Sequence, residues 1–326
     1  MAEKSPACKA LVTGATGFIG QALINRLVAT DIVGVRALRT SSKLAPPNRW
    51  TDVLIGNIDG ETDWDEAFDA VDVVVHLAAR VHVTEEEEPD PLAAFRRVNA
   101  DGTIRLARQA AEAGVKRLVY LSSIKVLGDV TDGRGPFTQT DSFDPRDAYA
   151  ISKVQAELAL REISTETGLE VVILRPPLVY GPGVKGNFRT LLDWVDRGLP
   201  LPLRAVRNQR SLLGLENLID LISICLEHPD AAGQVFHAGD REDVSTPELL
   251  RRVGAALGKP ARLFPVPEPF LYASAGVLGR KDQIQRLCGS LQVDSGKARE
   301  MIGWMPRVSM EEELARTVRD PSLRSG

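Results

Sequence analysis

Short apolar runs alternate with helical patterns along the first half of the chain. Strand-like runs occupy residues 10–13, 32–38, 52–55, 72–77, 116–121 and 171–174. Helical periodicity fills most of the gaps between them, over residues 18–29, 63–70, 90–113 and 148–167. Strands that alternate with helices predict an α/β fold with a parallel sheet covered on both faces. Right-handed crossovers then bring the carboxyl ends of the strands to one edge, where a ligand crevice is expected.

Three glycines follow the first predicted strand at three-residue spacing. The strand ends at Thr13. Gly14, Gly17 and Gly20 follow it, and the helical pattern of residues 18–29 begins among these glycines. The first glycine permits a tight turn, the second lets the backbone approach a pyrophosphate, and the third lets helix and strand pack closely. The amino end of the helix adds unpaired N–H groups and a positive dipole end. The segment therefore predicts a dinucleotide site.

A tyrosine and a lysine stand four residues apart at the head of a later helical pattern. Tyr149 and Lys153 share one helix face, and Ser123 ends the strand-like run before them. A phenol is a poor base at neutral pH, but a nearby positive charge lowers its pKa. Such a tyrosine can exchange a proton with a sugar hydroxyl or ketone while a hydride moves at carbon. Behind a dinucleotide loop, this pattern favours a dehydrogenase-type enzyme.

The end of the second predicted strand bears on the choice between NAD and NADP. Folds that prefer NAD usually carry an acid there for the ribose 2′-hydroxyl, whereas an Arg accommodates a 2′-phosphate. Arg39 stands at this position, and no Asp or Glu occurs between Asp31 and Asp52. The pattern favours NADP(H), with NAD(H) still possible. Arg36 and Arg39 could instead merely solvate an exposed strand end.

Composition narrows the classes of partner. A net charge of -4 gives no electrostatic footprint for nucleic acid. Three scattered cysteines suit a reducing cytosol, and four histidines show no metal-ligand spacing. The start of the chain does not resemble a signal peptide, and the apolar stretch 270–278 is too short to span a bilayer, so we expect a buried or interface helix there. We expect a cytoplasmic enzyme without metal or membrane insertion, with the acidic run Glu85–Glu88 solvated.

Further motifs accompany the glycine loop, Ser123, Tyr149 and Lys153. In chain order they are Val73–Ala79, Asn99, Val119–Ser123, Arg175–Gly183, and Asp294–Lys297 before Gly303-Trp304. With the glycine spacing G-x-x-G-x-x-G, they closely resemble the extended short-chain dehydrogenase/reductase family. The resemblance runs from about residue 8 to about residue 310, nearly the whole chain.

The resemblance implies both architecture and cofactor contacts. It implies a Rossmann-type doubly wound parallel sheet in residues 1–178. A smaller mixed C-terminal substrate-binding lobe would follow in residues 179–326, with some segments returning to the main sheet. The residues that it implies for cofactor binding are Gly14, Thr16, Gly17, Phe18, Ile19, Gly20, Arg39, Asn57, Ile58, Leu77, Ala78, Ala79, Asn99, Tyr149, Lys153 and Pro176.

The same resemblance implies roles for the catalytic residues. Ser123 would hydrogen-bond the reacting sugar oxygen, and Tyr149 would act as acid and base. Lys153 would lower the pKa of Tyr149 and hold the nicotinamide ribose. Asn99 would orient its helix or a water, a structural role more than a chemical one. The 4,6-dehydratase branch places an Asp-Glu pair after its Ser/Thr, but this chain has Ile124 and Lys125. Since neither can perform carboxylate chemistry, dehydratase activity is not expected.

Two reactions at C4 of a UDP-sugar remain. A reductase would release its cofactor after one hydride transfer, and Arg39 favours it. Segments 76–82, 122–126 and 210–218 also resemble bacterial UDP-sugar proteins of O-antigen clusters. The first prediction is therefore reduction of UDP-4-keto-6-deoxy-N-acetylhexosamine to UDP-N-acetylquinovosamine in surface-polysaccharide (lipopolysaccharide) biosynthesis. The alternative is a UDP-glucose or UDP-N-acetylglucosamine 4-epimerase that retains NAD. A non-catalytic NADP(H)-sensing regulator is the remote alternative.

Substrate contacts and oligomeric state follow from the resemblance as well. Arg210 and Arg286 would clamp the diphosphate, because Arg suits diphosphate better than Lys. Asn187 would reach the uridine side. The full expected set for the substrate is Arg80, Ser123, Lys125, Asn187, Arg210 and Arg286. Family members often form homodimers through helices that correspond to 90–113 and 148–167. Here an apolar set could form that face or could equally face the sheet: Ala107, Ala111, Ala156 and Leu160.

Overall fold

A parallel sheet forms the centre of the protein in a computed structural model, which describes residues 8–42, 45–81, 90–277 and 281–321. The strands of this sheet are β1 (Lys9–Thr13), β2 (Val33–Leu38), β3 (Trp50–Leu54), β4 (Val73–His76), β5 (Arg117–Leu121), β6 (Glu170–Arg175) and β9 (Val235–His237). They lie in the order β3-β2-β1-β4-β5-β6-β9, and every neighbouring pair is parallel. This order confirms the predicted doubly wound fold.

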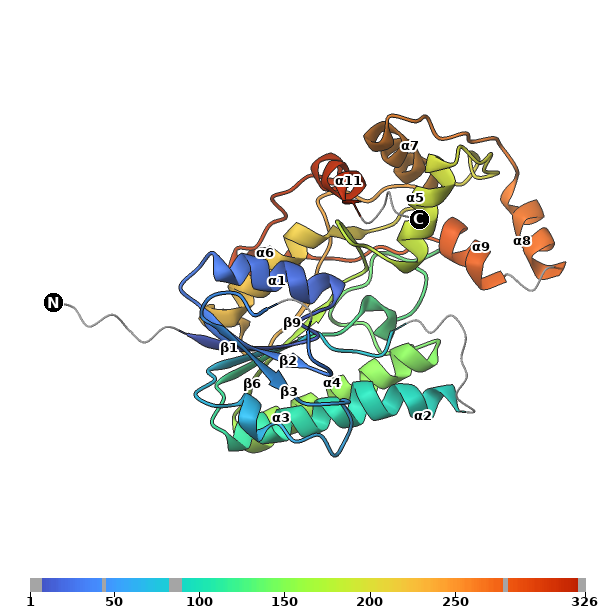
Figure 1. Cartoon of the computed structure of the whole chain (residues 1–326). Coiled ribbons are helices and arrows are strands. Elements are labelled where there is room, and N and C mark those ends of the chain that lie inside the picture. Colours follow the sequence, from blue (N-terminus) through green and yellow to red (C-terminus); the bar gives the residue numbers. More distant parts are fainter. Residues whose placement is uncertain (1–7, 43–44, 82–89, 278–280, 322–326) are drawn as a thin grey trace.

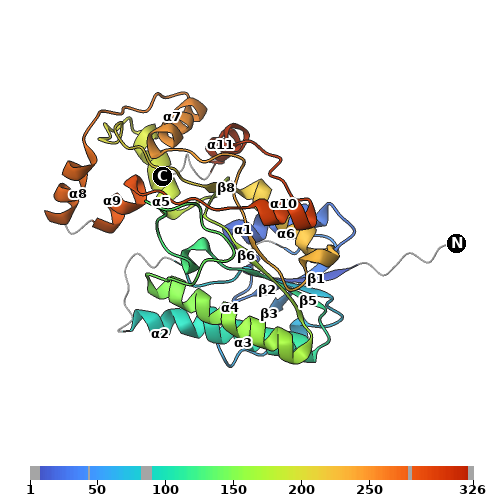
Figure 2. The same ribbon diagram turned by 180° about the vertical axis from the view of Figure 1, so that it is seen from behind.

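Helices cover both faces of the sheet (Figures 1 and 2). One face carries α1 (Phe18–Val28), α6 (Leu215–Glu227) and α10 (Gly296–Ile302). The other carries α3 (Gly102–Glu112) and α4 (Ala148–Thr167). Successive side chains of each strand point to opposite faces of the sheet, so each strand contributes to both apolar layers. In β1, Ala10 and Val12 are buried in the first layer and Leu11 in the second.

The second half of the chain builds a smaller lobe beside the carboxyl edge of the sheet (Figure 1). Its elements are β7 (Leu178–Tyr180), β8 (Leu212–Gly214), α5 (Gly186–Asp196), α7 (Thr246–Leu257), α8 (Glu268–Val277), α9 (Lys281–Cys288) and α11 (Met310–Arg319). β7 and β8 pair in parallel, and the lobe has its own apolar core. The chain returns to the main sheet through β9.

Two helix predictions differ from the structure. The expected helix at 63–70 is a single 3₁₀ turn, Asp65–Ala67. The apolar spacing that suggested a helix comes from Trp64, Ala67 and Phe68, whose side chains are buried in the core. The helix cannot continue past this turn because Ala70 has a positive φ of 50°. The expected helix 90–113 is α2 (Pro91–Arg96), a π-helical turn (Arg97–Asp101) and α3.

Three of the four apolar residues considered for a dimer face lie inside the protomer. Ala107, Ala156 and Leu160 are fully buried in the layer between α3, α4 and the sheet, whereas Ala111 is half-buried at the edge of this layer. The three buried residues therefore cannot supply the intermolecular contact, and the homodimer stays a prediction. In α8, Leu271 is buried and the Phe270 side chain is exposed, so this helix is only half covered.

Other expectations concern metals, membranes and the acidic run. Within the described ranges, no group of three or more His, Cys, Asp or Glu side chains could hold a metal ion. Among these same residues, no helix is both long and apolar enough to cross a bilayer. The run Glu85–Glu88 lies outside the described residues.

Candidate active site

The glycine loop lies tightly between β1, β4 and α1. Gly14 has a φ of +66°, and a Cβ there would come 2.7 Å from the backbone nitrogen of Ala78. A Cβ on Gly20 would come 2.2 Å from the carbonyl oxygen of Gly14. Gly17 precedes α1 without a side-chain cap, so the first N–H groups of the helix stay available for an anion. These residues fit the pyrophosphate of a dinucleotide.

Phe18 and Ile19 begin α1 beside this loop and are partly buried against the core. Thr16 is exposed, and its carbonyl accepts a hydrogen bond from the Gln21 amide at 2.7 Å. The loop therefore presents backbone and one hydroxyl side chain outward, while its apolar residues anchor it.

A chain of buried hydrogen bonds supports the loop from below. Thr13 Oγ1 accepts from the N–H groups of Leu77 (3.2 Å) and Ala78 (3.1 Å), so its own proton is donated to His76 Nδ1 (2.7 Å). His76 Nε2 then donates to Thr103 Oγ1 (3.0 Å). Burial lowers the pKa of His76 to about 3, with the charge of Lys153 acting in the same direction. The neutral imidazole of His76 therefore orients the Thr13 hydroxyl, which in turn holds the backbone of Leu77 and Ala78 beside Gly14.

Ser123, Tyr149 and Lys153 come together at the carboxyl edge of the sheet. Ser123 follows β5, while Tyr149 and Lys153 lie in the first turns of α4. The hydroxyl of Ser123 lies near the phenol of Tyr149 and lowers the pKa of this phenol. Lys153 Nζ lies 5.9 Å from the centroid of the Tyr149 ring and donates to the carbonyl of Leu121 at 2.9 Å. The geometry can present a hydroxyl, a phenol and an ammonium to one substrate.

The local electrostatics differ from the expectation for this group. Burial raises the pKa of Tyr149 well above its ordinary value, and the charge of Asp147 raises it further. The nearby hydroxyl of Ser123 lowers this pKa and so opposes both effects. Burial lowers the pKa of Lys153 to about 7, against the attraction of Glu157. Desolvation thus outweighs the expected lowering of the tyrosine pKa by Lys153 in the protein alone.

Asn99 joins three parts of the site from within the π-helical turn. Its Oδ1 accepts from the backbone N–H of Arg80 at 2.8 Å, and its Nδ2 donates to the carbonyl of Arg80 at 3.0 Å. The same Nδ2 donates to Ser152 Oγ at 3.0 Å. Asn99 therefore holds the exit of β4 against α4, which agrees with an orienting role. π-Helical turns often occur at functional sites.

Arg80 belongs to an aromatic stack beside the phenol. Its Cζ lies 5.6 Å from the centroid of the Phe95 ring. Phe95 in turn meets Tyr149 edge-on, with 6.2 Å between the ring centroids. Phe95 thus lies between the guanidinium of Arg80 and the phenol of Tyr149, and the contact of Arg80 with the sugar stays a prediction. Ala79 precedes Arg80 in the chain. The carbonyl of Pro176 accepts a hydrogen bond from the Ile124 N–H at 3.0 Å.

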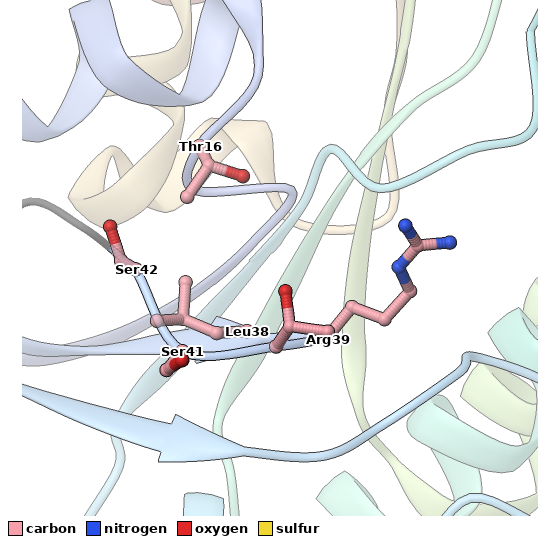
Figure 3. Close-up of a pocket in the computed structure, with 6 residues that line it drawn as sticks. Thr16, Leu38, Arg39, Ser41 and Ser42 are labelled. Atoms are coloured by element: carbon pink, nitrogen blue, oxygen red, sulfur yellow. The ribbon is translucent and has the colours of Figure 1, made fainter.

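A hollow follows β2 at the expected adenosine end. It is lined by Thr16, Leu38, Arg39, Thr40, Ser41 and Ser42. Figure 3 shows Thr16, Ser41 and Ser42 near one another, while the Arg39 side chain extends away from them. Arg36 is buried and paired with Asp52 at 2.6 Å, so it does not solvate a strand end.

Asn57 and Ile58 follow β3 on the same side. The carbonyl of Asn57 accepts from the Thr62 hydroxyl at 2.9 Å, and its residue is exposed. Ile58 packs against the layer of α3. Both positions are compatible with a contact to the adenine, which the sequence predicts.

The expected diphosphate and uridine residues occupy the smaller lobe. Arg210 Nη1 donates to the carbonyl of Gly289 at 3.0 Å, and burial lowers the pKa of this guanidinium. Arg286 is exposed in the last turn of α9, three residues before Gly289. Both arginines therefore lie at the same end of α9. Asn187 is exposed in the first turn of α5.

Lys125 is engaged by two carboxylates. Its Nζ forms an ion pair with Asp147 and a second one with Asp129 at 3.4 Å. The sequence predicts a substrate contact for this ammonium, whereas the structure places it between protein side chains.

Sequence reasoning missed two groups around the site. Asp147 caps α4 by accepting from Ala150 N–H at 2.7 Å, and an Asp before a helical pattern was a signal that could have found it. Glu157 is fully buried and accepts from Ser122 Oγ (2.5 Å) and Arg175 Nη2 (2.5 Å). No local pattern predicts this second group, because its members come from the segment after β5, from α4 and from β6.

Comparison with known proteins agrees with this geometry. Residues 10–239 match the NAD dependent epimerase/dehydratase family. The chain belongs to the NAD-dependent epimerase/dehydratase family. A UDP-glucose 4-epimerase from Vibrio cholerae is 41% identical over 311 residues, which cover 94% of this chain and 93% of the relative. An N-acetyl-alpha-D-glucosaminyl-diphospho-ditrans,octacis-undecaprenol 4-epimerase from Escherichia coli O157:H7 is 26% identical, over 94% of this chain and 93% of the relative.

Solved structures of similar fold include complexes with NAD. The Bordetella bronchiseptica enzyme WbmG in complex with NAD matches with a TM-score of 0.76 and 22% identity, over 98% of this chain and 95% of that one. MoeE5 in complex with UDP-glucose and NAD matches with a TM-score of 0.75 and 24% identity, over 95% and 97%. At this level of identity the likeness supports the family fold, with the site argued from the residues themselves.

Proposed function

We propose that this protein is a UDP-sugar 4-epimerase that oxidises C4 and reduces it again from the opposite face. The observation that carries the proposal is the convergence of Ser123, Tyr149 and Lys153 at the sheet edge that also holds the glycine loop. The near full-length similarity to a UDP-glucose 4-epimerase supports it. The reductase, which the sequence placed first, has less support than this alternative.

The residues of the chain divide the work between proton transfer and orientation. A bound nicotinamide dinucleotide supplies the acceptor and donor of hydride. Tyr149 takes the proton from the 4-hydroxyl and returns it after the sugar has turned. Ser123 hydrogen-bonds the reacting oxygen, and Lys153 adds a positive charge that favours the phenolate. Gly14, Gly17 and Gly20 would hold the pyrophosphate.

Dehydration is disfavoured by the residues after Ser123. Ile124 is buried, and Lys125 is held by Asp129 and Asp147. Elimination of water needs an acid and a base positioned beside the sugar. Asp129 and Asp147 are both engaged in ion pairs with Lys125, so neither is presented as the free acid or base that a dehydratase requires.

A 4-keto-sugar reductase that uses NADPH is the second candidate function. The observation that favours it is the hollow after β2, which offers an exposed Arg39 and the hydroxyls of Thr16, Ser41 and Ser42. A 2′-phosphate would find charge-assisted partners there. An epimerase needs no such preference, because it regenerates its cofactor in each turnover.

One pair of assays separates these two functions. Purified protein is incubated with UDP-glucose or UDP-N-acetylglucosamine and catalytic NAD, and the 4-epimers are resolved by chromatography. In parallel, it is incubated with UDP-4-keto-6-deoxy-N-acetylglucosamine and NADPH, whose absorbance is followed. We expect epimer formation without net cofactor change. Stoichiometric NADPH consumption without epimer formation would replace the epimerase by the reductase.

A further inference from the structure

A single lysine connects the serine turn to the helix that carries the tyrosine. Lys125 lies in the 3₁₀ turn Ile124–Val126, directly after Ser123. Its backbone N–H donates to Ser123 Oγ at 3.3 Å. Its ammonium reaches Asp147 at the start of α4 and Asp129 at 3.4 Å. The side chain is 22% exposed, so solvent screens these charges only in part.

Asp147 is tied to the tyrosine by the helix itself. Its Oδ1 caps α4 through Ala150 N–H at 2.7 Å, and Tyr149 follows two residues after it. The negative charge of Asp147 raises the pKa of Tyr149, second only to burial. A positive partner on Asp147 therefore reduces the repulsion that a phenolate would meet.

We propose that Lys125 is a positioning residue that keeps Tyr149 able to accept a proton, by neutralising Asp147 and fixing the serine turn to α4. The inference rests on the proposed function, in which Tyr149 exchanges a proton with the sugar hydroxyl. Lys125 thus acts through Asp147 and Ser123, and its ammonium does not need to touch the substrate.

Other charged and titratable groups also face the phenol. Lys153 lies on the same helix, and Tyr120 on β5 is coupled to Tyr149 by charge. Arg80 lies behind Phe95 in the aromatic stack. Lys125 forms an ion pair with Asp147. Removal of the Lys125 ammonium should therefore act on the phenol through Asp147.

The first test is the pH dependence of kcat for Lys125→Met, in the direction in which Tyr149 accepts a proton. Activity should rise with pH as the phenol ionises. Without the ammonium, the midpoint of this rise should move upward by about one pH unit, as expected for loss of a nearby opposite charge. At neutral pH kcat should fall about tenfold and recover at alkaline pH, while KM changes little.

A double-mutant cycle assigns the effect to Asp147. Asp147→Asn keeps a good helix cap but removes the charge, so its midpoint should lie at or below that of the wild type. Adding Lys125→Met to Asp147→Asn should then shift the midpoint much less than it does alone. Lys116→Met is a matched control, because it breaks a Lys–Asp pair of 3.0 Å with Asp72 at the amino ends of β5 and β4. This control should leave the profile unchanged.

Each other outcome has a defined meaning. A wild-type profile in Lys125→Met, a pH-independent loss, a rise in KM alone, or an equal shift in the Asp147→Asn background would overturn the proposal. If Lys125→Met fails to fold, Lys125→Arg decides, since it must retain the wild-type midpoint. A wild-type protein that turns over no UDP-sugar contradicts the proposed function instead. The Lys125 proposal is then decided by the Tyr149 pKa, measured as tyrosinate absorbance relative to Tyr149→Phe.

Discussion

At the residue scale, burial disfavours the charged forms of Tyr149 and Lys153, which the proposed chemistry requires. The pKa of Tyr149 is raised and that of Lys153 is lowered to about 7, both chiefly by desolvation. The nearby hydroxyl of Ser123 opposes the shift of Tyr149, and the charge of Glu157 opposes the shift of Lys153. Binding of a ligand that adds positive charge near the phenol would also lower the pKa of Tyr149.

Removing the phenol hydroxyl tests the proposed acid and base directly. Tyr149→Phe should lower kcat by about 10²–10⁴-fold, the usual contribution of general acid–base catalysis. Dinucleotide affinity should change little, since the ring and its edge contact with Phe95 remain. The measurement is steady-state epimerisation together with fluorescence titration of NADH. A variant that keeps more than about a tenth of the wild-type rate would contradict the role of Tyr149.

Cofactor choice is a second property of single residues. Arg39 is exposed, so its side chain can turn toward Thr16 and Ser42 without repacking the core. If the second candidate function holds, a contact with a 2′-phosphate should contribute roughly 1.5–3 kcal/mol, a tenfold to hundredfold preference for NADPH over NADH. Arg39→Asp should reverse this order, and the neutral Arg39→Met should abolish it. Isothermal titration with both dinucleotides checks this, and tighter NADH binding by the wild type would exclude the phosphate contact.

At the element scale, the sequence was sufficient where a strand or helix carries its own pattern. The apolar runs of β1, β4, β5 and β6 and the period of α4 appear in the structure near their expected bounds. β9 escaped notice because Val235–His237 is too short to show alternation, and it is defined by pairing with β6. The Lys125–Asp147 pair joins positions 22 residues apart, so only the packed elements reveal it.

Helix α11 is docked through a buried acid whose protonation should affect stability. Glu313 is fully buried, and burial raises its pKa from 4.5 to about 7. Arg316 at 3.7 Å opposes this shift, while Glu216 and Asp240 add to it. The pKa of Glu313 is higher in the folded protein than in the unfolded chain, so protonation of this acid stabilises the fold. This contribution to the free energy of unfolding is complete below about pH 4.5 and is lost as pH rises through about 7.

Glu313→Gln should remove this dependence. Relative to wild type, the variant should become more stable by roughly 1–3 kcal/mol as pH rises from about 5 to about 8. Urea unfolding at a series of pH values measures the difference, and other titrating groups cancel because both proteins share them. A stability difference that stays constant over this range would show that Glu313 titrates at an ordinary pKa. Glu312→Gln serves as the exposed neighbour for comparison.

At the scale of the whole molecule, the fold brings the carboxyl edge of the main sheet against the smaller lobe. The glycine loop, Ser123 and Tyr149 come from the sheet side, and Arg210 and Asn187 from the lobe. Order along the chain could predict the first group, since consecutive βα units converge at one edge. The second group depends on how the loops of the lobe pack, which no short pattern encodes. Phe18 packs with the cores of both parts and so links them.

Ligand-linked stability tests whether this arrangement binds a dinucleotide as a unit. A ligand at about a hundred times its Kd should stabilise the folded protein by about 2.7 kcal/mol, seen as a higher Tm with NAD(H) or NADP(H). Gly14→Ala should lose this rise, because its Cβ would lie 2.7 Å from Ala78 N. Gly168→Ala is the matched control, with a φ of +79° and no atom within 4 Å of its Cβ. It should lower Tm through backbone strain alone and keep the ligand-induced rise. An equal rise in both variants would place the dinucleotide away from the glycine loop.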